Sequence, residues 1–417
     1  IGEFAEKPRY QGGGSSHINP FRVVSALDAA GEKGRSVTYA KGFSNENDSM
    51  TEQELEKALR TAAEADVAVI FAGLPEIFES EGYDRTSMKL PKCQDRLIEE
   101  VLKVQPNVVV VLHNGSPVEL PWADRVSAIL EMYLGGQGVG EACDRLLFGE
   151  ANPSGRLSET FPYRLEDNPS FLHFPGNGKR VLYGEDIFVG YRYYDTKKVP
   201  VRYAFGHGLS YTEFTYGDLT LSSAQMTDED ILTVSLKVKN SGKTEGKEVV
   251  QLYVADLCGI SERPVKELKG FAKVHLLPGE EKTVSMEISA RNLSYYEERL
   301  GDWYAPSGTY RILIGHASDD IRLHADVVFE TKKKLPLRVD FTTTFGELLD
   351  HTKTAPVITE LLAPLAAAAA SAEGMSDEYK KLGEQVIREM PLKSLLGQMP
   401  GEQVEQLIGQ LNCLLAQ

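Results

Sequence analysis

The sequence predicts a protein of the α/β class, with a doubly wound, mostly parallel sheet followed by an all-β sandwich and a short helical tail. Two observations support this fold class. Over residues 1–165, continuous apolar runs such as "DVAVIFAGL" alternate with helix-like segments, which is typical of parallel strands covered on both faces. Over residues 215–333, short runs such as "ILTVSLKVKNSG" alternate strictly between apolar and polar residues, which predicts half-buried antiparallel strands.

The first 165 residues form the predicted α/β domain. We expect a short helix in "RVVSALDAAGEKG", a strand in "RSVTYAKGF", and a helix in "MTEQELEKALRTAAEA", where Thr51 and Glu54 fit a capping box. The runs "DVAVIFAGL" and "NVVVVLHNG" predict two buried strands, with the helix "QDRLIEEVLKV" between them. The run "VSAILEMYLGGQGVGEACDRLLFG" predicts a strand, a glycine-rich turn and a last helix.

Three further parts follow this domain. Residues 166–214 are rich in Tyr, Gly and Phe, and we expect a connector packed between two domains. In residues 215–333, one face of a strand carries Leu232, Val234, Leu236 and Val238, as expected for a β-sandwich of roughly 100 residues. Residues 334–417 predict a helical, partly low-complexity tail that is either loosely packed or an appendage for a partner.

Composition restricts the partners. The formal net charge of −16 argues against nucleic acid or an anionic membrane as a partner. No apolar stretch reaches membrane-spanning length, and no signal peptide precedes "IGEFA". The chain opens without Met, so we expect its true N-terminus to lie upstream. The four cysteines are far apart, which predicts free thiols, no metal site and a reducing, cytoplasmic location.

Two loops could carry chemistry. The loop "GLPEIFESEGYDRTSMKLP" (residues 73–91) leaves the carboxyl end of a predicted strand, which is the edge where α/β sheets bind ligands. It holds Glu76, Glu79 and Glu81, although an acidic loop is most often simply solvated. The loop "YQGGGSSHINP" allows close backbone approach to a ligand, but it lacks the lysine of a phosphate-binding loop. The run "GGQGVG" has no acidic ribose partner, so we expect no cofactor.

Several motifs, taken in order, resemble those of glycoside hydrolase family 3 β-glucosidases. They are "QGGGSSHINP", "ESEGYDRTSMKLP", "HNGSPVELPW", "EDIFVGYRYYD", "YAFGHGLSYTEF" and "ELKGFAKVHLLPGEEKTV". The resemblance covers the first 335 residues and implies the family's α/β sandwich and fibronectin type III-like domains. It also implies that the family's N-terminal (β/α)8 barrel, which carries the nucleophilic aspartate, is missing from this chain.

The resemblance implies roles for single residues. Glu81, in "SEGYDR", is the expected general acid/base, with Glu79 as the alternative acid. Gly14, Ser15 and Ser16 are expected at the substrate pocket, where Ser15 and Ser16 either hydrogen-bond sugar hydroxyls or hold the loop. Asp84 and Arg85 are expected to pair and fix the loop, whereas Glu76 and Glu79 suit a solvated acidic surface. Neither a metal nor an organic cofactor is implied.

The implied reaction is hydrolysis, with retention, of terminal β-linked glucose from a β-glucoside or oligosaccharide. A chain with one carboxylate of a two-carboxylate site should be inactive without the barrel, and Glu81 should then face water and titrate near an ordinary glutamate. Two alternatives stay open. The chain could be a non-enzymatic binding or assembly module, or it could be a subunit completed by a separate barrel chain.

Overall fold

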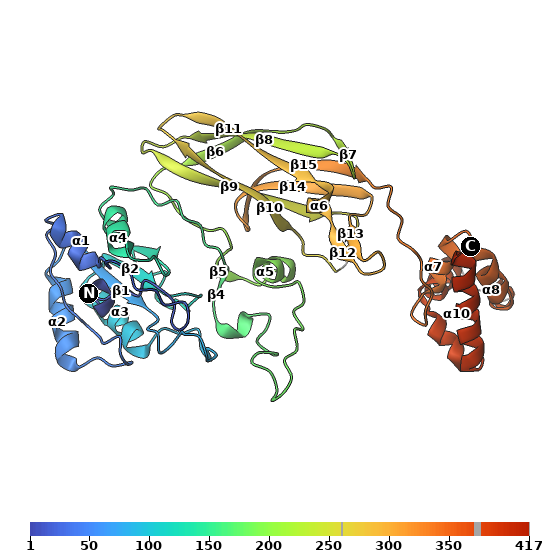
Figure 1. Cartoon of the computed structure of the whole chain (residues 1–417), viewed down its shortest axis with the longest axis horizontal. Helices are drawn as coiled ribbons and strands as arrows, with labels where there is room; N and C mark the ends of the chain where they lie inside the picture. The colour runs from blue at the N-terminus through green and yellow to red at the C-terminus, as the bar shows by residue number, and fades with distance from the viewer. Residues whose placement is uncertain (260–261, 371–376, 417) are drawn as a thin grey trace. The chain divides into compact units, whose positions relative to one another are not determined.

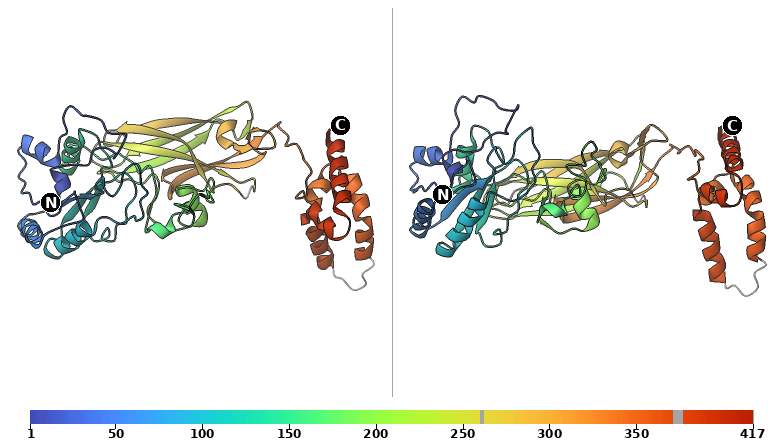
Figure 2. Two further views of the ribbon diagram at one scale, coloured as in Figure 1. Left: turned by 60° about the horizontal axis from the view of Figure 1, so that its bottom comes forward. Right: turned by 90° about the horizontal axis from the view of Figure 1, so that it is seen from below.

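Three parallel strands form the sheet of the α/β domain in a computed structural model that describes residues 1–259, 262–370 and 377–416. In the order β1-β2-β3, they are Ala68–Gly73, Val108–His113 and Ala128–Glu131. The helices are α1 (Ala26–Glu32), α2 (Glu52–Ala63), α3 (Lys92–Val104) and α4 (Val139–Leu147), after a short 3-10 turn η1 (Glu3–Ala5). Helices α1 and α4 lie on one face of the sheet and α2 and α3 on the other (Figure 1, Figure 2), so the predicted doubly wound class is confirmed.

Local signals in this domain were accurate, with one exception. Helix α2 begins with the predicted capping box, in which Thr51 accepts from Glu54 N and the Glu54 side chain accepts from Thr51 N. The strand predicted in residues 35–43 is wrong, because no strand is assigned there. This segment instead buries Ala40 and Phe43 in the core. Its backbone hydrogen bonds run from Gly2 N to Ala40 O at 3.2 Å, from Arg35 N to Ala30 O at 2.9 Å and from Phe43 N to Lys41 O at 2.8 Å, and none of them pairs it with a strand. Its apolar pattern therefore reflects burial without sheet pairing.

The β-sandwich consists of two sheets, as predicted (Figure 1). One has the order β10-β9-β14-β15-β7 and the other β11-β8-β6. The strands are β6 (Phe214–Leu221), β7 (Gln225–Thr227), β8 (Ile231–Asn240), β9 (Gly246–Asp256), β10 (Glu267–Leu276), β11 (Glu281–Ser289), β14 (Gly308–Ala317) and β15 (Asp320–Glu330), with α6 (Ala290–Leu293) after β11. The predicted alternation in β8 is confirmed, since Leu232, Val234, Leu236 and Val238 are all buried.

The connector holds β4 (Phe161–Pro162), η2 (Leu165–Asp167), α5 (Tyr191–Lys197) and β5 (Val201–Tyr203). Helix α5 contacts the sandwich directly. Leu268 N donates to Tyr191 Oη at 2.8 Å, and Lys266 pairs with Asp195 at 2.7 Å. The aromatic ring of Tyr191 also meets the ring of Tyr253 of β9 edge-on, with centroids 5.9 Å apart. Residues 191–214 are therefore fastened to the β-sandwich by hydrogen bonds, an ion pair and ring contacts.

The tail is a unit with a core of its own, formed by residues 331–417 together with the hairpin of β12 (Tyr295–Glu297) and β13 (Asp302–Tyr304). Its helices are α7 (Phe345–Asp350), α8 (Ala355–Ala370), α9 (Asp377–Glu389), η3 (Leu392–Gly397) and α10 (Gly401–Ala416). Its core includes Phe345, Leu348, Ile358, Leu392 and Val404. The expectation of a loosely packed tail is therefore wrong for the described residues, because apolar side chains from several helices pack together in this core. No helix in the described chain is both long and apolar enough to cross a bilayer.

A buried ionic cluster joins the connector to the sandwich. The Glu248 carboxylate of β9 is fully buried and accepts from Arg156 Nη2 at 2.9 Å and from Tyr216 Oη at 2.8 Å. It also meets His316 Nδ1 at 2.8 Å, while His316 Nε2 lies 2.9 Å from the Gly208 carbonyl oxygen. Burial opposes ionisation of Glu248, but His316 and Arg156 outweigh it, so the pKa of this carboxyl lies below its ordinary value.

Replacing Glu248 should therefore destabilise the protein strongly. Glu248→Gln leaves the buried cation Arg156 without a counter-charge, and we expect a loss of about 3–5 kcal/mol in the free energy of unfolding. Urea unfolding at pH 7 measures this loss. Because the folded-state pKa is lowered, the stabilisation is present at neutral pH and is lost as the pH falls through the acidic range, so the difference from the parent should shrink there.

The matched control is Glu99→Gln, which breaks a half-exposed pair with Arg125 on the domain surface. Such pairs contribute about 0–1 kcal/mol. Equal losses for the two variants would show that the Glu248 cluster does not support the fold.

Candidate functional site

The two loops singled out from the sequence meet beyond the carboxyl end of β1. Ser15 N donates to Glu81 Oε2 at 2.5 Å, and Glu81 N donates to the Gly13 carbonyl oxygen at 3.3 Å. Gly14 has φ of +99°, and a Cβ added there would lie 2.6 Å from Glu81 Cβ. Only glycine permits this approach, because the backbone conformation and the space both exclude a side chain. The structure thus brings Gly14 and Ser15 to Glu81, whereas Ser16 is exposed beside Gly12 and makes no recorded contact with Glu81.

Glu81 is an exposed carboxylate held by its neighbour. Hydrogen bonds from the side chain and backbone of Ser15 hold the pKa of Glu81 below the ordinary glutamate value. The expectation that Glu81 faces water in this chain agrees with its exposure. The expectation that it titrates near an ordinary glutamate is wrong, because the hydrogen bonds from Ser15 favour the ionised form and lower the pKa.

Glu79, two residues earlier, lies in a different environment. Arg9 Nη1 donates to Glu79 Oε2 at 2.5 Å, and Gly115 N donates to the same oxygen at 2.7 Å. Ser116 Oγ donates to Oε1. Burial opposes ionisation of Glu79, but Ser116, Gly115 and Arg9 together bring its pKa below the ordinary value. Glu79 is therefore a largely buried anchor that is ionised at neutral pH, and the expectation that it is a solvated surface group is wrong.

The loop is fixed by Arg85, but through a different partner from the one expected. Arg85 Nη1 lies 3.5 Å from Glu79 Oε1 and donates to Ser116 Oγ at 2.5 Å and to the Pro117 carbonyl oxygen at 3.3 Å. Asp84 is exposed, and no Asp84–Arg85 pair forms among the described residues. The predicted pair is therefore wrong, because Arg85 turns inward toward the buried carboxylate. Glu76 is exposed, as expected, and meets His17 Nε2 at 3.0 Å.

Sequence reasoning missed two buried carboxyls nearby. Burial raises the pKa of Glu131 to about 8, against hydrogen bonds from Tyr133 N and Asn114. Burial also raises the pKa of Glu159 to about 7. Glu131 is the last residue of β3, so the rule that ligands gather at strand ends could have pointed to it. Glu159 lies in an irregular segment whose sequence gave no signal.

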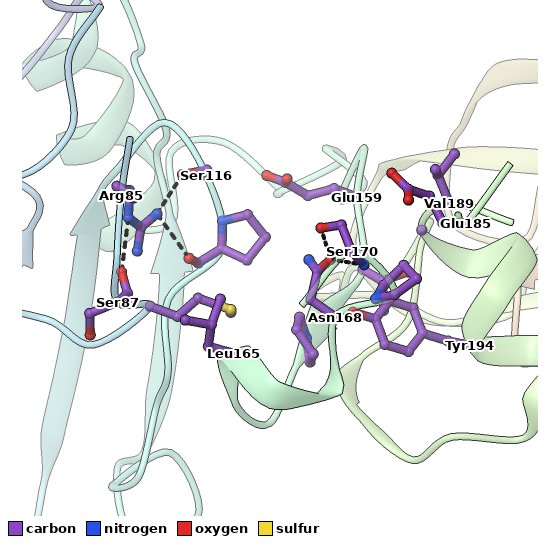
Figure 3. A pocket seen from close by; sticks show the side chains of 16 residues that line it. Arg85, Ser87, Ser116, Glu159, Leu165, Asn168, Ser170, Glu185, Val189 and Tyr194 are labelled. Atoms are coloured by element: carbon purple, nitrogen blue, oxygen red, sulfur yellow. Dashed lines mark hydrogen bonds between the residues drawn. The ribbon is translucent and has the colours of Figure 1, made fainter. Parts of the chain in front are cut away.

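A cavity of about 390 Å³ lies beside the acidic loop. Figure 3 shows Arg85 and Ser116 on one side of it, Glu159 near the middle, and Glu185 and Tyr194 on the other side. Among the described residues, no three His, Cys, Asp or Glu side chains come together as ligands for a metal. The loops therefore meet at the exposed carboxylate of Glu81, which is held by a backbone donor and lies two residues from the buried ionic anchor Glu79.

Two family comparisons match this architecture. The Glycosyl hydrolase family 3 C-terminal domain matches residues 1–211, and the Fibronectin type III-like domain matches residues 248–318. Thermostable beta-glucosidase B of Acetivibrio thermocellus is 46% identical over 99% of this chain and 55% of its own length. The Exo-alpha-(1->6)-L-arabinopyranosidase of Bifidobacterium breve is 39% identical over 100% of this chain and 53% of its own.

A solved structure gives the same result. The GH3 beta-glucosidase of Bifidobacterium adolescentis superposes with a TM-score of 0.79 at 39% identity, covering 86% of this chain and 52% of that one. The chain thus spans about half the length of these relatives. With matches to both the C-terminal and the fibronectin type III-like domains, this chain belongs to glycoside hydrolase family 3.

Proposed function

We propose that this chain is the C-terminal portion of a retaining β-glucosidase and that Glu81 is the general acid/base. The observation that supports this most is the contrast between the two neighbouring carboxylates. Glu79 is occupied by Arg9, Gly115 and Ser116, so it has little freedom to exchange a proton with a substrate. Glu81 is exposed at the tip of the loop, where a second domain and a sugar can reach it.

The reaction needs a second carboxylate. In a retaining glycosidase, one carboxylate attacks the anomeric carbon while the acid gives its proton to the departing glycosidic oxygen. The same residue then takes a proton from the water that hydrolyses the glycosyl-enzyme. In this proposal the nucleophile lies on the barrel and carries out the first attack, and Glu81 carries out the proton transfers.

Assembly with the barrel would also prepare Glu81 for its role. An acid must hold its proton near neutral pH, but the hydrogen bonds from Ser15 favour the ionised form in this chain. Covering Glu81 with a second domain removes water and brings a like charge close, and both effects raise the pKa of a carboxyl. The domain that supplies the nucleophile therefore also shifts Glu81 toward the protonated acid.

The proposed substrate is a terminal β-linked glucosyl residue, and neither a metal nor a cofactor takes part. Gly14, Ser15 and Ser16 would line the sugar pocket beside Glu81, since the loop that carries them contacts that residue. Glucose is favoured because the relative with 46% identity is a beta-glucosidase, whereas the arabinopyranosidase is 39% identical. The sugar contacts that separate such enzymes would lie on the barrel.

Variants of Glu81 and Glu79 test the assignment. They are made in a fusion in which the N-terminal part of the Acetivibrio thermocellus enzyme precedes residues 1–417. Glu81→Gln should lower turnover of poorly activated glucosides about 10²- to 10⁴-fold, because proton transfer is lost. Dinitrophenyl glucosides, whose leaving group needs no proton, should lose less. Azide should restore part of the second step by attacking the glycosyl-enzyme directly.

Glu79→Gln is the matched control, two residues away in the same loop. It should lower the unfolding temperature, because Arg9 loses its buried counter-charge, and azide should restore nothing. The assignment would be overturned if azide rescued Glu79→Gln and had no effect on Glu81→Gln.

The chain by itself should be inactive. Catalysis needs both carboxylates positioned on one substrate, and this chain offers only the acid/base at the site. An aryl-glucoside assay on purified residues 1–417 should show no turnover, and the fusion should regain it. Turnover by the chain alone that survives repurification and disappears in Glu81→Gln would mean that a second carboxylate of this chain acts as nucleophile.

A further inference from the structure

Two short segments of the chain, residues 155–157 and 205–208, pair with each other beside the β-sandwich. Leu157 N donates to the His207 carbonyl oxygen at 2.9 Å, and Gly206 N donates to the Leu157 carbonyl oxygen at 2.8 Å. We call them the paired segments. Two backbone hydrogen bonds are too few to make a stable unit, so the position of the paired segments depends on their contacts with the sandwich.

The end of strand β14 supplies such contacts. Ser318 N donates to the Phe205 carbonyl oxygen at 2.9 Å, and His316 Nε2 lies 2.9 Å from the Gly208 carbonyl oxygen. The other ring nitrogen, His316 Nδ1, lies 2.8 Å from Glu248 Oε1. The imidazole ring therefore stands between a carboxylate of β9 and a carbonyl oxygen of the paired segments.

Both partners of the His316 ring accept hydrogen bonds. A neutral imidazole has one N–H donor and one acceptor nitrogen, and a backbone carbonyl such as that of Gly208 can only accept. Glu248 could donate only if it were protonated. Arg156 Nη2 contacts this carboxylate at 2.9 Å, however, and the pKa of Glu248 lies below its ordinary value. Only an imidazolium, with a proton on each nitrogen, satisfies both contacts.

The surroundings of the ring are compatible with a cation. The His316 side chain is 15% exposed, so water has little room to replace either partner. The two nearby arginines are each paired with a carboxylate, and burial lowers the pKa of His207, which adds no charge at neutral pH. The charged and titratable groups around the ring come from every neighbouring element: Glu248 of β9, Tyr216 of β6, Asp320 and Arg322 of β15, Arg156 and His207 of the paired segments, and Asp319.

We propose that His316 is held as an imidazolium in the folded protein and acts as a pH-dependent clasp that fastens the paired segments to the β-sandwich. When the ring gives up one proton to the solvent, a nitrogen lone pair faces an oxygen, and either Glu248 or Gly208 loses its donor. Because the folded protein favours the protonated ring, the stabilisation is complete below about pH 6.5, the ordinary value for histidine, and is lost as the pH rises into the alkaline range.

Nitrogen NMR of residues 1–417, labelled with 15N-histidine and free of a histidine tag, tests the protonation state. An imidazolium gives two similar 15N shifts, whereas a neutral ring gives two widely separated ones. At about pH 8, where an ordinary histidine is almost entirely neutral, one ring should keep the imidazolium pattern, and this pattern should disappear in His316→Gln. The chain unfolded in urea is the control and should show neutral rings only.

Two NMR results would overturn the inference. One is a neutral pattern for all eight histidines of the folded chain at that pH, and the other is an imidazolium pattern that persists unchanged in His316→Gln. The first result needs no variant, so the test remains decisive even if His316→Gln does not fold.

Hydrogen exchange measures the clasp itself. The exchange rates of the Leu157 and Gly206 amides, divided by the intrinsic rate at each pH, should show protection that falls several-fold between about pH 6 and about pH 9. In His316→Gln this protection should already be low at the lower pH and change little. Residues 232–238 of β8, in the other sheet, are the control and should stay protected throughout. Protection of the two amides that does not depend on pH in the parent chain would contradict the clasp.

Discussion

The geometry of the acidic loop depends on one buried anion. Glu79 is held away from water, and a carboxylate in that position is tolerated only when donors surround it. Those donors come from three places in the chain: Arg9 near the N-terminus, Arg85 farther along the same loop, and the Gly115–Ser116 turn after β2. Because all of them converge on one side chain, the segments that carry them cannot move independently. This arrangement also positions Glu81, which lies two residues after Glu79 in the same loop.

The same principle acts a second time at Glu248. There a buried carboxylate joins Arg156, near the end of the α/β domain, to strands of the β-sandwich. In both clusters, a buried carboxylate holds together segments that are distant in the sequence. Glu131 and Glu159 show the contrasting case, since burial outweighs the groups that favour ionisation and raises the pKa of each. At Glu79 and Glu248, an arginine and several hydrogen-bond donors instead bring the pKa below the ordinary value.

The sequence predicted those features that depend on local order. The capping box of Thr51 and Glu54, the apolar run of β1 and the alternation of Leu232 to Val238 each lie within one element, and each is confirmed. The errors lie where contacts between segments distant in the sequence determine the structure. The run around Ala40 is apolar because it packs in the core. Arg85 pairs with the buried Glu79 instead of the adjacent Asp84. For the site, the position of the acidic loop at the carboxyl end of a predicted strand was found from the sequence. Arg9 was not predicted, because no local sequence pattern indicates an arginine that lies 70 residues from its partner. The catalytic role of Glu81 stays a prediction.

The contact that holds Glu81 has a consequence for mutational scanning. Ser15 offers its backbone N–H to the carboxylate in addition to its side chain, and the backbone donor survives almost any substitution at position 15. Gly14 touches Glu81 only by lacking a side chain, yet any replacement there forces the two loops apart. A survey that ranks residues by their sensitivity to substitution would therefore rank Gly14 among the most important positions and would underrate Ser15. The ranking would report which position tolerates a larger side chain. It would not detect the backbone hydrogen bond from Ser15 that orients the Glu81 carboxylate, because substitutions at position 15 do not remove it.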